Sequence, residues 1–198
     1  MDDGRKLGDF LEFHHVPVLA REVIEQLLWR RDGIYVDATV GGGGHARLLL
    51  ERAGREARLI AFDQDPNALE AARKALEDRA AQVVFIHSNF VHLQRVLTER
   101  KLVPVDGILF DLGVSSPQLD VGERGFSYRH DAPLDMRMDP TSGVTAADLI
   151  ASLSEQELAR ILSEYGEERW AKRIAEFIVE ERRHSPITTT GHLGDVIK

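Results

Sequence analysis

Four consecutive glycines, Gly41 to Gly44, form the stretch whose composition most strongly suggests chemistry. An apolar run that ends in Asp37 precedes them, and His45 and a second apolar run follow. This order predicts a strand, a tight turn and the N-terminus of a helix. Because glycine lacks a Cβ, the backbone of such a turn can approach a ligand closely, and open α/β sheets bind nucleoside cofactors at this position. The spacing also fits a dinucleotide fingerprint, and a glycine-rich hairpin without a ligand is the remaining interpretation.

A second candidate group is Asp63, which ends an apolar run 22 residues after Gly41. A carboxylate at that position can accept hydrogen bonds from the two hydroxyls of a ribose. Dinucleotides and S-adenosylmethionine both contain this ribose, so Asp63 does not distinguish the two cofactors. The alternative role is to cap the next helix, for which Asp65 is better placed. We therefore expect Asp63 to bind a ribose.

Two further polar stretches follow the next apolar runs. Phe90 can lie against an adenine ring, with Asn89 or the backbone at the edge of the base, or it can anchor the following helix. Asp111 opens the sequence DLGVSSPQLD. An acid there complements the positive charge of a sulfonium, and the small hydroxyl residues leave room for a nucleotide, whereas a dehydrogenase gains little from this arrangement. The alternative for this stretch is a capped loop that leads to a linker.

Composition limits the class of protein. The 198 residues include 25 Lys and Arg against 33 Asp and Glu, a net charge of −8, so a nucleic-acid partner has to be bound by a local patch. The chain has no cysteine, which excludes disulfides and thiolate metal sites, and it has no apolar run of membrane-spanning length. The adjacent His14 and His15 lack a third ligand at a recognisable spacing, so we predict no metal site. The N-terminus lacks the features of a signal peptide, and we expect a cytoplasmic protein without membrane contact.

Apolar periodicity indicates the elements that must position these groups. Four short apolar runs alternate with helical patterns, which predicts an α/β fold whose parallel sheet is covered by helices on both faces. Since the carboxyl ends of parallel strands share one rim, Asp37, Asp63, Phe90 and Asp111 should gather there. The predicted strands are residues 34–36, 58–63, 83–86 and 105–111, and the predicted helices are residues 20–29, one after the glycines, one that begins at Pro66 and one over residues 91–97.

The pattern changes after Asp120. A stretch rich in turn residues is followed by helical patterns from Thr145 onward, with capping-box spacing at Thr145 and at Ser154. We therefore predict a cofactor-binding domain of residues 1–120 and a helical region of residues 121–198. A four-stranded sheet in the order 3-2-1-4 leaves an apolar edge uncovered. We expect further strands beyond Lys198 in the natural protein or, as the alternative, a partner chain in a homodimer.

The longer motifs resemble those of one family. The sequence is similar to the RsmH/MraW methyltransferases, which use S-adenosylmethionine to methylate the N4 amine of a cytidine in the decoding region of bacterial 16S ribosomal RNA. The resemblance covers nearly the whole chain, and DLGVSSPQLD followed by ERGFSY and PLDMRMDP is its most specific part. The other matching motifs are HHVPVL, DATVGGGGHA, AFDQDP and YGEERWAKRIA.

This resemblance implies a Rossmann-like methyltransferase sheet, incomplete here, with an inserted helical domain. It also implies S-adenosylmethionine as the cofactor and 16S ribosomal RNA, within the small ribosomal subunit, as the partner. The glycine turn departs from the family pattern at Ala38, Val40 and Ala46, which are small changes on an apolar wall. Family members continue well beyond Lys198, so we expect this chain to be a fragment. The family's cofactor-binding positions fall on Gly43, Gly44, His45, Asp63, Phe90, Asp111 and Gln118.

Asp111 is the predicted catalytic residue, because an acceptor for the N–H of the target amine would favour its attack on the methyl group. An NAD-dependent oxidoreductase is the second interpretation, and a non-catalytic fragment or assembly module is the third. Several basic and aromatic residues are predicted to contact RNA, although the paired ones also fit solvated helix faces. They are Arg124, Phe126, Tyr128, Arg129, Arg137, the pair Lys172 and Arg173, and the pair Arg182 and Arg183.

Overall fold

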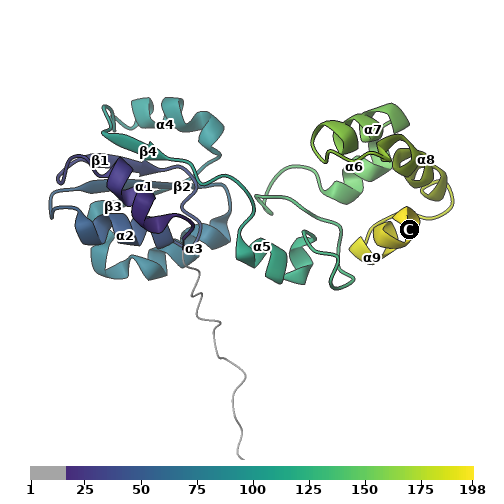
Figure 1. The fold of residues 1–198 in the computed structure, drawn as a ribbon, viewed down its shortest axis with the longest axis horizontal. Coiled ribbons are helices and arrows are strands. Elements are labelled where there is room, and N and C mark those ends of the chain that lie inside the picture. The colour runs from purple at the N-terminus through teal and green to yellow at the C-terminus, as the bar shows by residue number, and fades with distance from the viewer. Residues whose placement is uncertain (1–16) are drawn as a thin grey trace, which may run out of the picture. The chain divides into compact units, whose positions relative to one another are not determined.

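The computed structural model describes residues 17–198. The chain divides into two compact units between Asp111 and Leu112, and each is described here by itself. The first unit is an α/β sheet domain and the second is helical (Figure 1). His14 and His15, for which we predict no metal role, lie outside the described residues. Among the described residues, no helix is long and apolar enough to cross a membrane.

The first unit is built on four parallel strands in the order β3-β2-β1-β4, as the sequence predicts. Three strands agree closely with the apolar runs, since β1 is Ile34–Asp37, β2 is Arg58–Asp63 and β3 is Val83–His87. The fourth, β4 (Gly107–Leu109), is shorter than the predicted 105–111. Its carboxyl end leaves the ladder because the backbone N–H of Asp111 donates to the side chain of Thr39 rather than to a strand.

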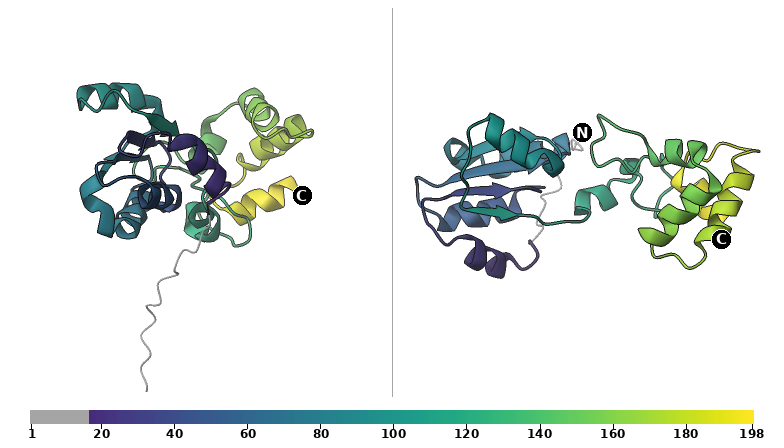
Figure 2. Two further views of the ribbon diagram at one scale, coloured as in Figure 1. Left: turned by 60° about the vertical axis from the view of Figure 1, so that its left-hand side comes forward. Right: turned by 90° about the horizontal axis from the view of Figure 1, so that it is seen from above.

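Helices cover both faces of this sheet, which confirms the α/β prediction (Figures 1 and 2). Successive strand residues point to opposite faces, so Tyr35 and Leu59 pack on one side while Val36 and Ile60 pack on the other. Since both sides are buried, the strands have continuous apolar runs. Helices α1 (Ala20–Leu27), α2 (Gly44–Arg52) and α3 (Pro66–Ala75) cover the first face, and α4 (Leu93–Glu99) covers the second.

Local capping chemistry determines where α3 and α4 begin. The Asp65 carboxylate accepts the N–H of Asn67 at 2.9 Å and Pro66 occupies the first turn, so the predicted N-terminus of α3 is confirmed. The 3₁₀ segment η1 (Glu77–Gln82) then leads into β3. The helix expected from Val91 begins instead as the 3₁₀ turn η2 (Phe90–His92), because Asn89 caps that turn before α4 starts.

The second unit contains the helices predicted after Thr145. These are α6 (Ala146–Ser152), α7 (Glu155–Glu164), α8 (Ala171–Glu181) and α9 (Thr190–Ile197). The capping boxes at Thr145 and Ser154 are both formed. A small core that includes Leu158, Ala175 and Ile178 holds these helices together. An antiparallel bridge between Pro133 and Thr189 ties the turn-rich stretch to the start of α9.

The segment between the sheet and these helices belongs to the second unit. Residues 112–120, which the sequence places in the predicted cofactor-binding domain, lie in the second of the two units. They contain a short helix that the sequence did not predict, α5 (Ser116–Asp120), which packs against the 3₁₀ turn η3 (Gly122–Arg124). A hydrogen bond from Gln118 to Met138 also joins this segment to the turn-rich stretch.

Candidate functional site

The glycine bend connects β1 to α2 and requires glycine at two of its positions. Gly41 has a φ of 52° and Gly43 a φ of 86°, a region that other residues rarely adopt. A Cβ on Gly43 would lie 3.3 Å from the Cα of Ala72, so this residue also allows α2 and α3 to approach closely. At Gly42 a Cβ would meet nothing within 4 Å. The bend therefore presents bare backbone to open space at its tip, and it is the predicted strand-to-helix turn rather than a hairpin.

Asp63, at the carboxyl end of β2, holds the bend in place. Its Oδ2 accepts the backbone N–H of Gly41 at 2.9 Å, and its Oδ1 accepts the N–H of Asp65 at 2.9 Å. Burial raises the pKa of this carboxyl, while the backbone donors oppose the shift. Each carboxylate oxygen retains a second lone pair, so Asp63 can accept hydrogen bonds from a ligand and position the bend at once.

Asp111 lies beside the same bend. Its backbone N–H donates to the Thr39 hydroxyl at 2.8 Å, and its Oδ2 is 3.6 Å from Nε2 of His45. His45 is buried in the first turn of α2, whereas the Asp111 side chain is 52% exposed. The residues on either side of the glycines therefore fix the position of Asp111 and leave its carboxylate accessible.

A third acid at this rim is Asp37, which we expected to be near the crevice but did not select as a site residue. Its side chain is 3% exposed, and one carboxylate oxygen accepts the N–H of Thr39 at 3.2 Å. Burial raises its pKa to about 7; the Thr39 hydrogen bond opposes this shift, and the neighbouring Asp63 and Asp111 reinforce it. An acid at the end of an otherwise apolar central strand was the signal that could have identified it.

The aromatic group of the rim is Phe90, on the turn after β3. Its ring meets that of Phe110 edge to face, with centroids 5.6 Å apart and planes at 87°. Phe90 thus lies next to the residue that precedes Asp111, and it is 36% exposed. The Asn89 amide donates to Gln64 at 2.7 Å and its oxygen caps the following turn.

Gln118 is the only one of the predicted cofactor residues in the second unit. Its Oε1 accepts the N–H of Ser115 at 2.9 Å, which completes a capping box at the start of α5. Its Nε2 contacts the sulfur of Met138 at 3.2 Å, and the side chain is buried. The structure therefore gives Gln118 a local role within its own unit, and its role toward a cofactor stays a prediction.

Together, these contacts assemble an acidic rim from neighbouring strands, defined by Asp37, Asp63 and Asp111. Three carboxyl groups close to an exposed backbone bend favour a ligand with positive charge and disfavour the two phosphates of a dinucleotide. These carboxyl groups suit S-adenosylmethionine. Its ribose hydroxyls can donate hydrogen bonds to an acid such as Asp63, and its sulfonium carries a positive charge. Within residues 17–198, no group of three His, Asp or Glu side chains is arranged to hold a metal ion.

The requirement for glycine can be tested with a matched pair of substitutions. We expect Gly43→Ala to lower the free energy of unfolding by about 1–2 kcal/mol, because alanine is strained at positive φ and its Cβ would press on Ala72. Gly42→Ala should change it by less than about 0.5 kcal/mol, since space is open there. Urea denaturation of the two variants measures both values, and equal losses would contradict this account.

The raised pKa of Asp37 predicts an unusual pH dependence of stability. The protonated carboxyl stabilises the fold fully below its ordinary pKa of 3.8, and this contribution is lost as the pH rises through about 7. Asp37→Asn, which cannot ionise, should be more stable than the unsubstituted chain at pH 8 by at least about 1 kcal/mol. The gain should be clearly smaller at pH 5, where the folded carboxyl stays protonated, and it should vanish only below about pH 3.8. Urea denaturation at both pH values checks this, and a gain that is the same at both would show that Asp37 does not titrate as described.

Comparison with known proteins identifies the family of this chain. The family model described as the MraW methylase family matches residues 12–198. The "Ribosomal RNA small subunit methyltransferase H" of Symbiobacterium thermophilum is 54% identical over 188 residues, which are 95% of this chain and 59% of that protein. The protein of the same name from Heliobacterium mobile is 55% identical over 189 residues, covering 95% of this chain and 61% of its own length. The chain thus spans about three fifths of the length of these relatives.

Similarity to solved structures is weaker. A putative rRNA-methylase from Clostridium thermocellum aligns over 48% of this chain and 50% of its own, with 24% identity and a TM-score of 0.42, which is too low to bear on function. The assignment depends instead on the family model, which matches nearly the entire chain. The chain belongs to the MraW methylase family.

Proposed function

We propose that the protein of which this chain is a part transfers a methyl group from S-adenosylmethionine to 16S ribosomal RNA. The target that the sequence motifs imply is the N4 amine of a cytidine in the decoding region. The names of the relatives support methylation of small-subunit ribosomal RNA. The observation that carries the proposal is the acidic rim around the exposed glycine bend, which suits a cationic nucleoside.

The first unit supplies most of the proposed cofactor contacts. Gly43 caps α2, and Gly44 and His45 begin it, so the positive end of the helix dipole would face a ligand at the bend. Asp63 would accept the ribose hydroxyls and Phe90 would lie against the adenine. Asp111, with its accessible carboxylate, would face the positively charged end. Gln118 remains in the proposed set on the strength of the family motif alone.

Asp111 is also the proposed catalytic residue. Bound at this rim, S-adenosylmethionine supplies an electrophilic methyl group on its sulfonium. The N4 amine of cytosine is a poor nucleophile because its lone pair is delocalised into the ring. A carboxylate that accepts one N–H of this amine orients the lone pair and favours attack. Asp111 is held by Thr39 and His45 while its oxygens stay accessible, as this role requires.

The second unit narrows the set of residues that could contact RNA. Three of the predicted arginines are used to hold the fold. Arg124 donates to the carbonyls of Arg137 and Met138, Arg137 forms a bidentate ion pair with Asp135, and Arg182 donates to the carbonyls of Ile150 and Leu153.

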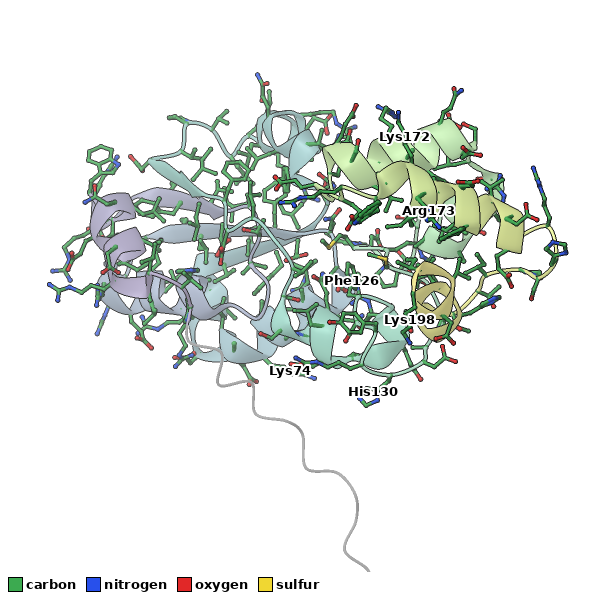
Figure 3. The ribbon with its side chains drawn as sticks, turned by 45° about the vertical axis from the view of Figure 1, so that its right-hand side comes forward. Lys74, Phe126, His130, Lys172, Arg173 and Lys198 are labelled. Carbon is green, nitrogen blue, oxygen red and sulfur yellow. The ribbon has the colours of Figure 1, made fainter. Side chains whose placement is uncertain are left out.

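Of the remaining predicted contacts, Phe126 is half-buried and the others are exposed. Tyr128 is 88% exposed, and Arg129, Lys172, Arg173 and Arg183 are exposed as well. Lys172 and Arg173 both belong to α8, and their side chains are labelled in Figure 3. The guanidinium of Arg173 lies 5.1 Å from the ring centre of Phe177. An unstacked RNA base can stack on a guanidinium plane or an aromatic ring of this kind. We propose these exposed residues as the RNA contacts, and a net charge of −8 favours an assembled particle over naked RNA as the substrate.

Cofactor choice separates this proposal from the oxidoreductase alternative. We expect S-adenosylmethionine to bind in a calorimetric titration and NAD to show no binding, because the acidic rim repels a pyrophosphate. Asp63→Asn should raise the dissociation constant by about 10- to 100-fold, because the hydrogen bonds from the ribose would lose their charged acceptor. Asp78→Asn, an exposed acid on η1, is the control and should bind as the unsubstituted chain does. Tight binding of NAD would refute the proposal.

Methyl transfer tests the catalytic assignment. Small ribosomal subunits that lack the modification, incubated with the full-length protein and labelled cofactor, should acquire a methyl group on a cytidine of 16S RNA. Asp111→Ala should abolish transfer, since both the acceptor and the negative charge are lost. Full activity of that variant would exclude Asp111 as the catalytic residue. A full-length protein that binds the cofactor yet methylates no subunit would support the assembly-module alternative.

A further inference from the structure

Asp37 occupies the centre of the acidic rim. In the sheet register it pairs with Ala61 on one side and with Leu109 on the other. Asp63 and Asp111 each lie two residues beyond these partners, so acids from both neighbouring strands flank it. Asp37 is 3% exposed, whereas the Asp111 side chain is 52% exposed. A buried carboxyl between two others is costly to ionise unless a positive charge is added nearby.

The groups around Asp37 define what controls its proton. Asp63 on β2 and Asp111 after β4 both favour the neutral form of Asp37, and Asp65 further raises the pKa of Asp63. His45 on α2 lies beside Asp111, and the N–H of Thr39 is the hydrogen-bond donor that favours the ionised form of Asp37. With a pKa of about 7, Asp37 is close to half protonated at neutral pH.

We propose that Asp37 exchanges its proton for the positive charge of the bound methyl donor, so that cofactor binding releases a proton from the protein. This inference depends on the proposed function, because it requires a cationic ligand at the acidic rim. Burial is the main reason that Asp37 stays neutral, and repulsion from Asp63 and Asp111 adds to it; a cation there offsets both costs of ionising the carboxyl. The carboxyl O–H bond then breaks and the proton passes to solvent, while the sulfonium charge balances the new carboxylate.

The exchange also gives Asp37 a positioning role. It accepts the N–H of Thr39, whose hydroxyl in turn accepts the N–H of Asp111. A hydrogen bond to an ionised carboxylate is stronger than one to a neutral acid. Ionisation of Asp37 therefore tightens the Thr39 turn and, through it, the position of Asp111. The acidic rim is therefore most ordered when S-adenosylmethionine is bound. Asp37 has this effect without contacting the reacting atoms.

Calorimetric titration of S-adenosylmethionine at several pH values tests this linkage. For a carboxyl with a pKa of about 7, the dissociation constant should fall roughly 20-fold between pH 5.5 and 7.5. Titrations at pH 6 in two buffers of different ionisation enthalpy should show release of about one proton. Asp37→Asn should remove this proton release and the associated part of the pH dependence, whereas Asp78→Asn should retain both. The amine of S-adenosylmethionine also titrates, but it contributes equally to every variant. Its contribution therefore cancels when the proton release of two variants is subtracted.

A second measurement does not depend on the folding of a variant. Infrared difference spectra of the unsubstituted protein should lose a protonated-carboxyl band when the donor binds at pH 6. Unchanged proton release in Asp37→Asn, or binding by the unsubstituted protein without loss of that band, would refute the exchange while leaving the methyltransferase proposal intact. Absence of any binding of S-adenosylmethionine would instead reject the proposed function, and the exchange with it.

Discussion

The bend between β1 and α2 is held from both sides by its neighbours in the sheet, and the rest of the site depends on this. On one side the Gly41 N–H bonds to Asp63 of β2, and on the other the Thr39 hydroxyl receives the N–H of Asp111. Since parallel strands place their carboxyl ends on one rim, three strand ends meet at one short turn. Glycine at the two positive-φ positions allows this turn to be tight enough for both contacts.

The acidity of the rim works against the stability of the fold. A carboxyl that is 3% exposed between two others has its pKa raised to about 7, which means that its charged form is unfavourable there. Folded proteins retain such groups mainly where function requires them. The arrangement that makes this charged form unfavourable would also complement a cationic nucleoside, so the raised pKa and the proposed specificity have one electrostatic origin.

Basic residues in the helical unit serve two different purposes. Arg124 and Arg182 lie where loops and helix ends present carbonyl groups that would otherwise lack donors, and their guanidinium groups satisfy these carbonyls. Lys172 and Arg173 instead lie on the exposed side of α8. A count of cations would treat them alike, yet only the exposed ones can meet a phosphate or a base.

The sequence by itself determined the features that depend on near neighbours in the chain. Apolar runs predicted β1, β2 and β3 almost to the residue, and the caps at Asp65, Thr145 and Ser154 formed as expected. These features were predictable because strand alternation and helix capping involve residues a few positions apart.

Only the tertiary structure decided the properties that depend on distant atoms. The central position of β1 in the sheet buries Asp37, and this burial raises its pKa, with a smaller contribution from Asp63 and Asp111 at the neighbouring strand ends. At the carboxyl end of β4, the backbone of Asp111 leaves the ladder to bond with Thr39, 72 residues away. Likewise, the engagement of Gln118 with Met138 depends on how a turn-rich stretch packs. Electrostatic and hydrogen-bond energies are determined by distances in space and by exclusion of water, which a linear pattern does not contain.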